Sequence, residues 1–223
     1  VGSHAVTAVF AGDGSFMGAT SSVPTQSVAQ PATASSVTSS VNPSAAGQSV
    51  TFTATVVAVA PGAGTPTGSV DLLDGATVIG TGVLDAAGVA TLSTAALAVG
   101  AHPITVRYAG DVSFAASTSP VLTQSVGQTM TTTSVTNSVN PSVAGQSVTF
   151  TAVVAAVAPG AGTPTGSVMF LDGAMTIGSA PLDASGTASL STSALAVGRR
   201  AGTAGNPGKG SFTRSTSPTL TQS

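Results

Sequence analysis

The chain repeats itself with a period of 98 residues. Residues 47–54, which read GQSVTFTA, return unchanged as residues 145–152. A period of this length is too long for a solenoid unit that needs its neighbours in order to fold, and it matches one small autonomous domain. The repeat therefore predicts the tail of one domain followed by two further domains. We call them the head segment (residues 1–28), the middle repeat (residues 31–126) and the last repeat (residues 129–223).

The composition excludes several classes of partner. The chain carries five Lys and Arg against seven acidic residues, and its pI is about 5.3, so no basic field exists to attract nucleic acid or an anionic lipid surface. Cysteine is absent, which excludes disulfides and thiolate metal sites. No apolar run approaches the ~18 residues that a membrane-spanning helix needs. We expect no nucleic-acid partner and no membrane span in this segment.

Alternation of apolar and polar residues predicts β-strands. Residues 49–57 place Val and Phe on one side and Thr on the other, and residues 104–108 alternate in the same way. Residues 70–72 lead into Asp74-Gly75, a dipeptide suited to a hairpin turn, and residues 85–88 form a second turn. About seven short strands fit into each repeat, and no helical stripe competes. The fold class is therefore all-β, with one antiparallel β-sandwich in each repeat.

Several motifs of the middle repeat resemble a known family. They are Asn42-Pro43, residues 47–52 (GQSVTF), residues 66–70 (PTGSV), Asp74-Gly75, residues 108–111 (YAGD) and Ser119. Together they resemble the bacterial immunoglobulin-like domain of group 3. The resemblance implies tandem immunoglobulin-like sandwiches of about seven strands each, in a secreted or surface-attached bacterial protein. It also implies stalk, spacer or adhesion roles, by analogy of fold and not from a site.

The last repeat departs from the pattern between residues 199 and 210. Where the head segment has Val6, Phe10 and Asp13, the last repeat has Gly, Asn and Lys. These replacements cannot fill an apolar core, so we expect segment 199–210 to be irregular and this domain to be the weaker one. The head segment is then a two-strand remnant of a truncated repeat. It either stays loose, or it complements the last repeat of another chain by strand exchange.

No constellation of catalytic residues stands out. Residues 202–211 resemble a phosphate-binding loop in their Gly, Lys and Ser content, but they lack its spacing and the following helix. A degraded copy of a repeat strand explains them better. His4 and His102 occupy equivalent positions just before a strand and read as solvated loop residues. No Gly-x-Ser-x-Gly motif occurs. We therefore expect no enzyme activity, no catalytic residue and no cofactor.

The aspartates read as turn residues. Asp74 and Asp85 recur as Asp172 and Asp183, whereas Asp111 is replaced by Lys in the last repeat. Turn aspartates usually cap their own backbone, and the Asp-x-Asp spacing of calcium sites is absent. We expect no metal site; the alternative is that Asp111 joins a calcium site at a linker. Aromatic residues are too sparse to form a surface on which sugars could stack. We expect Phe16 and Phe114 to pack in the core.

These observations favour a non-catalytic spacer or stalk segment of a secreted or cell-surface bacterial protein. Its partners would be the neighbouring repeats of the same chain. The alternative is an adhesion module that binds a protein or glycan ligand through loops 60–68 or 109–116. Loop 60–68 returns unchanged as residues 158–166, which favours spacing, because dedicated binding loops tend to be individual.

Overall fold

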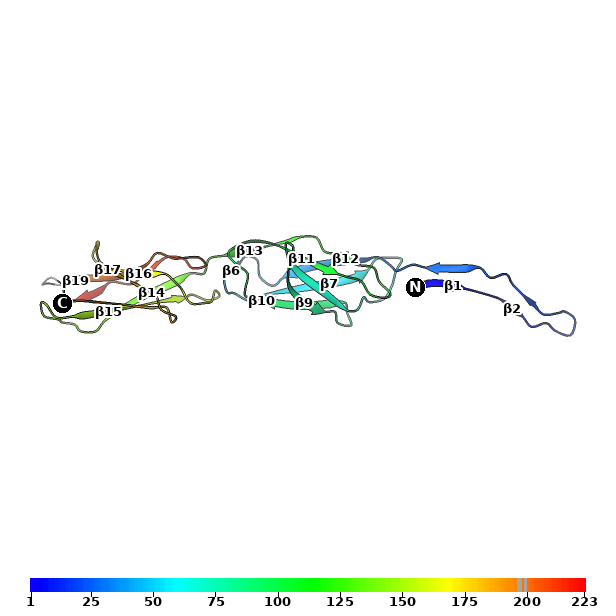
Figure 1. Cartoon of the computed structure of the whole chain (residues 1–223), viewed down its shortest axis with the longest axis horizontal. Coiled ribbons are helices and arrows are strands. Elements are labelled where there is room, and N and C mark those ends of the chain that lie inside the picture. Colours follow the sequence, from blue (N-terminus) through cyan, green and yellow to red (C-terminus); the bar gives the residue numbers. More distant parts are fainter. Residues whose placement is uncertain (196–197, 199) are drawn as a thin grey trace. The chain divides into compact units, whose positions relative to one another are not determined.

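The computed structural model describes residues 1–195, 198 and 200–223, and every regular element in this part of the chain is a β-strand (Figure 1). Contacts between Cα atoms divide the chain into two compact units. The first comprises Val1–Thr38, Phe52–Leu92 and Pro103–Leu122, and the second comprises Ser39–Thr51, Ser93–His102 and Thr123–Ser223. The first unit thus holds the head segment and most of the middle repeat, while the second holds the rest of the middle repeat and the last repeat.

The middle repeat forms two sheets of antiparallel and, in one place, parallel strands. One sheet has the order β10-β7-β5, and the other has the order β6-β13-β11-β8-β9 with β12 paired to β11. The strands are β5 (Thr33–Ser39), β6 (Ser44–Ala45), β7 (Val50–Ala58), β8 (Ser69–Asp74), β9 (Thr77–Val83), β10 (Val89–Thr94), β11 (Gly100–Tyr108), β12 (Ser117–Thr118) and β13 (Leu122–Gly127). The predicted all-β sandwich is confirmed.

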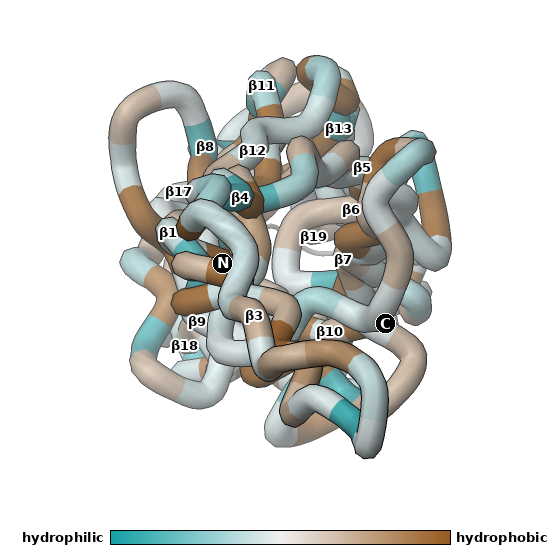
Figure 2. The backbone as a smooth tube through the Cα atoms, turned by 90° about the vertical axis from the view of Figure 1, so that its right-hand side faces the viewer, coloured by the Kyte–Doolittle hydropathy of each residue, from teal (hydrophilic) through white to brown (hydrophobic). Residues whose placement is uncertain are grey.

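Strand β7 shows why the repeat folds this way. Its apolar residues Val50, Phe52 and Val56 are almost completely buried, while the Thr residues between them are half exposed. Figure 2 colours the backbone by hydropathy and shows hydrophobic and more polar stretches following one another along the chain. A period of two places one side of the strand in the core and the other towards solvent, as the sequence predicts.

Both predicted turns form where the sequence places them. Strands β8 and β9 pair from Asp74↔Thr77 onwards, and Gly75 adopts a φ of 58°, which glycine tolerates without strain. At the second turn the Asp85 carboxylate accepts hydrogen bonds from the N–H groups of Ala87 and Val89. The turn aspartate thus caps its own backbone, as expected.

The last repeat has the same architecture. Its sheets have the orders β14-β15-β18 and β17-β16-β19-β20, with β21 paired to β19. The strands are β14 (Thr131–Asn137), β15 (Val148–Ala156), β16 (Ser167–Asp172), β17 (Met175–Pro181), β18 (Thr187–Thr192), β19 (Arg200–Asn206), β20 (Ser215–Thr216) and β21 (Leu220–Gln222). A single cluster of buried side chains from β15, β16, β17, β18 and β19 forms the core.

The prediction that segment 199–210 is irregular is wrong for residues 200–206; residue 199 lies outside the described residues. These residues form β19, which pairs with β16 from Met169↔Gly205 to Asp172↔Gly202. Backbone hydrogen bonds to neighbouring strands hold β19 although its side chains are small, and Pro207 falls just after its last residue.

The strand-exchange interpretation stays a prediction, because it concerns a second copy of the chain. A head segment could complement the last repeat of another chain only by displacing that repeat's own penultimate and final strands. In the described residues these strands are β19 and β21, which pair from Arg200↔Gln222 to Gly202↔Leu220.

The head segment consists of two short pairs of strands. Strand β1 (Gly2–Ala5) pairs with β4 (Thr25–Val28), and β2 (Val9–Phe10) pairs with β3 (Ala19–Thr20). All twelve residues of these strands are exposed. The head segment is therefore an ordered hairpin without a core of its own.

Candidate functional site

The beginning and the end of the middle repeat are joined by a compact group of hydrogen bonds. Strand β6 runs parallel to β13, with Ser44 opposite Val126 and Ala45 opposite Gly127. The Ala46 N–H extends this pairing by donating to the Gly127 carbonyl over 2.9 Å. We call residues 41–46 and 123–127 the clamp of the middle repeat.

Two side-chain amides reinforce the clamp. Asn42 donates from Nδ2 to the Thr123 carbonyl over 2.8 Å and accepts the Ser125 N–H at Oδ1 over 3.0 Å. Gln124, which is completely buried, donates from Nε2 to the Val41 carbonyl over 3.0 Å. An amide that donates and accepts at once behaves like an additional rung of the β-ladder.

The last repeat contains the same amide contacts without a strand equivalent to β6 among its described residues, and its Ser142 N–H donates to the Ser223 carbonyl over 2.9 Å. Asn140 donates to the Thr221 carbonyl over 2.8 Å and accepts the Ser223 N–H over 2.9 Å. Gln222 donates to the Val139 carbonyl and to Ser142 Oγ, each over 3.1 Å. The clamp is thus a feature of the repeat unit and not of one copy.

The amides of the two clamps also differ at Oε1 of the glutamine. In the last repeat Gln222 Oε1 accepts a hydrogen bond from Asn137 Nδ2. In the middle repeat the residue 98 positions earlier is Ser39, and among the described residues no protein donor reaches the buried Gln124 Oε1. The clamp of the middle repeat therefore carries an unpaired buried acceptor, which lowers its contribution to stability.

Sequence reasoning did not identify the clamp. Asn42 stands out only as part of the Asn42-Pro43 motif of the resemblance, and no local pattern marks Gln124. The available signal was a pair of polar residues, Asn42 and Gln124, that return 98 positions later as Asn140 and Gln222. The clamp contains hydroxyl groups but no group that titrates near neutral pH and could activate one, so its evident role is to hold two strands together.

Asp111 organises the turn after β11. Its Oδ1 accepts the N–H groups of Ser113 and Phe114, and its Oδ2 accepts both the N–H and the hydroxyl of Thr67. The Thr67 hydroxyl and then the Thr67 amide hold the pKa of Asp111 well below its usual range. Both carboxylate oxygens are engaged within the repeat. Asp111 is thus a turn cap, which confirms that expectation.

Tyr108 lies next to the Asp111 turn and packs in the core. The side chain is buried, and its hydroxyl donates to the Thr67 carbonyl over 3.0 Å. Burial, with the neighbouring Asp111 carboxylate, raises the pKa of Tyr108 to about 12. Thr67 therefore ties Asp111 and Tyr108 into one network, which closes one end of the core.

The last repeat lacks the tyrosine and the aspartate of the Thr67–Asp111–Tyr108 network. Asn206 stands in place of the tyrosine; its Oδ1 accepts the Gly208 N–H over 3.1 Å, while its buried Nδ2 has no protein acceptor among the described residues. Lys209 replaces the capping aspartate and forms an isolated bridge with Phe212. Residues 210–211 form a turn between Lys209 and Phe212, and the described chain after them contains no helix, so the strand-to-helix geometry of a phosphate loop is not formed.

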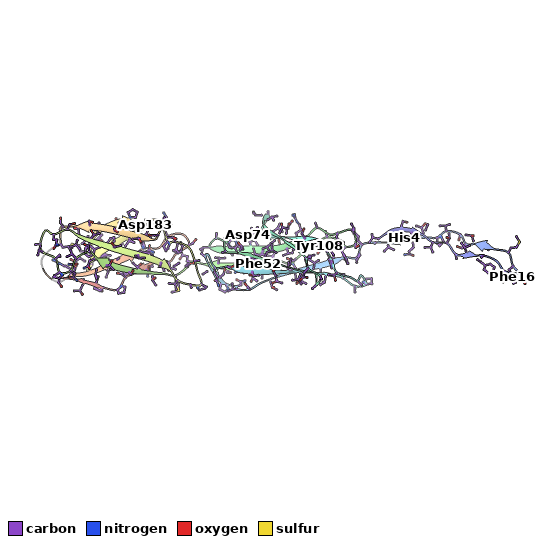
Figure 3. All side chains as sticks on the ribbon, turned by 90° about the horizontal axis from the view of Figure 1, so that it is seen from below. His4, Phe16, Phe52, Asp74, Tyr108 and Asp183 are labelled. Carbon is purple, nitrogen blue, oxygen red and sulfur yellow. The ribbon has the colours of Figure 1, made fainter. Side chains whose placement is uncertain are left out.

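The other candidate residues occupy separate places. His4 and His102 lie within β1 and β11 and not in loops, which corrects that expectation, and His102 Nε2 is 2.8 Å from the Ala98 carbonyl. Phe114 is buried as a core plug, whereas Phe16 lies exposed at the tip of the head segment (Figure 3). Among the described residues no three His, Asp or Glu side chains gather as metal ligands, and no helix is long and apolar enough to cross a bilayer.

Several solved structures match the chain at low sequence identity. The fibronectin(III)-like modules of Clostridium thermocellum CbhA are 20% identical, with 83% of this chain and 91% of that chain covered and a TM-score of 0.33. The Yersinia pseudotuberculosis adhesin InvE is 16% identical over 83% of this chain and 58% of that chain, with a TM-score of 0.39. The Escherichia coli adhesin FdeC is 15% identical over 85% and 64%, with a TM-score of 0.34. No curated protein sequence matches the chain.

The family model of the bacterial Ig-like domain (group 3) matches twice, at residues 37–127 and 132–223. The two matches cover most of the chain and correspond to the middle and last repeats, each with its two sheets and its clamp. The chain therefore belongs to the family of bacterial immunoglobulin-like domains of group 3.

Proposed function

We propose that the chain is a non-catalytic spacer segment of a secreted or cell-surface bacterial protein. Immunoglobulin-like domains are typically non-catalytic, and the clamps hold strands together without offering a reactive group. The unchanged return of loop 60–68 as residues 158–166 supports a repeated mechanical unit over a set of individual binding sites.

The observation that carries the proposal is the parallel pairing of β6 with β13. Strand β6 lies near the beginning of the repeat and β13 at its end. A pull on the two ends of a repeat therefore acts in opposite directions along these two parallel strands. The hydrogen bonds between them, together with those of Asn42 and Gln124, are then loaded in shear and share the force.

The surface of the middle repeat supports a role outside the cell. Arg107 is the only basic residue between positions 31 and 126, and it forms an ion pair with Asp71 over 2.7 Å. Trypsin-like proteases need a basic residue at the cleavage point, so a folded repeat of this composition offers them one site, within a strand. We therefore expect the folded middle repeat to resist trypsin-like proteases.

Single-molecule force spectroscopy on the whole chain tests the proposal. We expect two unfolding events, and we expect Gln124→Leu to lower the unfolding force of one of them and Gln222→Leu that of the other. Gln26→Leu in the head segment is the matched control and should leave both forces unchanged. Unaltered forces in both clamp variants would contradict the spacer role, and specific binding of the chain to a glycan or matrix protein would favour the adhesion alternative.

A further inference from the structure

The turn that follows β6 contacts the beginning of the last repeat. The residues of this contact are Ala46, Gly47, Thr129 and Ala161, and all four belong to the second compact unit. We propose that they form a lock, in which the Thr129 side chain joins the clamp of the middle repeat to the last repeat. The lock rests on the spacer function and deepens it, because it states how one repeat passes a pull to the next.

The backbone of Ala46 is the centre of the lock. Its carbonyl oxygen accepts the Thr129 hydroxyl over 2.6 Å and the Ala161 N–H over 3.2 Å, which uses both lone pairs. Its N–H donates to the Gly127 carbonyl over 2.9 Å, within the clamp. Ala46 is 4% exposed and Thr129 is 0% exposed. Because the contact is buried, opening it would leave polar groups without partners, and this cost keeps it closed.

The linker between the two repeats has almost no free length. Gly127 ends the clamp, and Thr129 is already held by the last repeat, since its N–H donates to the Ser211 carbonyl over 2.7 Å. Gln128 is the single residue between them, and its Nε2 donates to the Gly210 carbonyl over 2.8 Å. A pull along the chain therefore passes from the clamp to the last repeat without first extending a flexible segment.

The close approach in the lock depends on Gly47. A methyl group at this position would lie 2.5 Å from the Ala161 carbonyl oxygen, and the φ of 75° also favours glycine. The equivalent residue of the last repeat is Gly145, which has a φ of 81°, but there a methyl group would meet no described atom within 4 Å. The two glycines thus share one backbone conformation and differ in whether a neighbour lies against them.

A glutamine shapes the turn of the lock in advance. The Ala45 N–H donates to Gln48 Oε1 over 2.9 Å, and the Gln48 N–H donates back to the Ala45 carbonyl over 3.0 Å. In the last repeat Val143 and Gln146 form the same two hydrogen bonds, each over 3.0 Å. That turn forms without a neighbour at Gly145. The direction of the Ala46 carbonyl is therefore set by the repeat itself, and the contact with Thr129 costs little ordering.

The residue at the position of Thr129 decides whether a repeat can be locked in this way. In the middle repeat that position is Pro31, which has neither a hydroxyl nor an N–H. Pro31 keeps the same place in its own repeat, because its carbonyl accepts the Ala115 N–H over 3.0 Å as the Thr129 carbonyl accepts the Thr213 N–H over 2.9 Å. A repeat that begins with Thr can donate to the preceding turn through its hydroxyl, whereas one that begins with Pro cannot.

Hydrogen exchange of the Ala161 amide in the whole chain tests the lock. Thr129→Val removes the hydroxyl and keeps the shape of the side chain, so we expect this exchange to become faster by about threefold or more. Thr129→Ser keeps the hydroxyl and should stay at the wild-type rate. Ala63 has the same neighbours in sequence as Ala161, and its exchange should respond to neither substitution.

Two glycine variants separate the lock from damage to a turn. Gly47→Ala should abolish the protection of the Ala161 amide, whereas Gly145→Ala, with the same backbone strain and no neighbour, should leave it unchanged. A wild-type exchange rate in both Thr129→Val and Gly47→Ala overturns the lock, as does an equal increase in Thr129→Ser or Gly145→Ala. The clamp residues stay intact in these variants, so a failure of the lock is distinct from a failure of the spacer function, which Gln124→Leu and Gln222→Leu test under force.

Discussion

At the scale of the residue, buried amides and turn aspartates decide how tightly each repeat is closed. Gln124 and Gln222 are in the same position of the same clamp, yet one has a bonded Oε1 and the other does not. The difference traces to one neighbouring position, which is Ser39 in the middle repeat and Asn137 in the last. Paired repeats thus provide an internal control for the energetic value of a single hydrogen bond.

We predict that Ser39→Asn stabilises the middle repeat. The new amide would donate to Gln124 Oε1, as Asn137 does to Gln222 in the last repeat. One such hydrogen bond contributes about 0.5–1.5 kcal/mol to the free energy of unfolding. Chemical denaturation followed by circular dichroism measures it, with Asn137→Ser as the reciprocal variant that should destabilise the last repeat. A fall in stability with Ser39→Asn would contradict the assignment of Gln124 Oε1 as an unpaired acceptor.

Asp111 gives the middle repeat a specific sensitivity to acid. Its folded pKa is depressed, mainly by the Thr67 hydroxyl and amide, so its carboxylate favours the folded state above the unfolded pKa of about 3.9. That stability is lost progressively as the pH falls below this value. We expect unfolding curves between pH 6 and pH 2 to show a steeper loss for the wild-type middle repeat than for Asp111→Asn, which lacks the titrating group. The unfolding of the last repeat, which has Lys209 at this position, should not respond to the substitution; an equal response would argue against a local origin.

At the scale of the element, the strands followed from the sequence where an alternating pattern and a turn signal agreed. Strand β7 and the hairpin at Gly75 are of this kind. Strand β19 did not follow, because its own residues Gly202, Ala204 and Asn206 carry no strand signal. Its conformation is imposed by the backbone of β16, a tertiary effect that a local pattern cannot report. The clamp could not be predicted from the sequence for a related reason, since Asn42 and Gln124 lie far apart along the chain and neither is unusual alone.

One substitution at Asn206, the position of Tyr108 in the middle repeat, should raise the stability of the last repeat. Asn206→Tyr would return the residue that in the middle repeat packs in the core and donates to the Thr67 carbonyl. It would also remove the buried Nδ2 that lacks a protein acceptor. We expect a gain of about 1–3 kcal/mol in the stability of the last repeat, measured by calorimetry. Tyr108→Asn is the matched loss in the middle repeat, and a destabilising Asn206→Tyr would mean that the site has no room for the ring.

At the scale of the whole molecule, we expect the two repeats to be separate folding units that differ in stability. The last repeat has Gly202, Ala204 and Asn206 where the middle repeat has Ile104, Val106 and Tyr108, and a smaller core stabilises less. We predict two thermal transitions, the lower one belonging to the last repeat. At about 4–8 °C per kcal/mol for domains of this size, a deficit of a few kcal/mol separates them clearly.

Calorimetry of the whole chain, with Gln124→Leu and Gln222→Leu to mark the two transitions, checks this order. Gln124→Leu should move only the upper transition, and Gln222→Leu only the lower one. A single transition that both variants shift together would show that the repeats unfold as one unit, and would refute the expected difference in stability.

The head segment and the middle repeat pair their equivalent strands in the same register, which matters for recombination between gene copies of the repeat. Because β2 and β3 pair at the same positions as β11 and β12, a crossover between two gene copies of the unit joins segments whose contact partners already match. Recombination at an equivalent point therefore adds or removes a whole number of 98-residue units and preserves the strand register. The length of such an array can change in this way without altering how the strands of a unit pair.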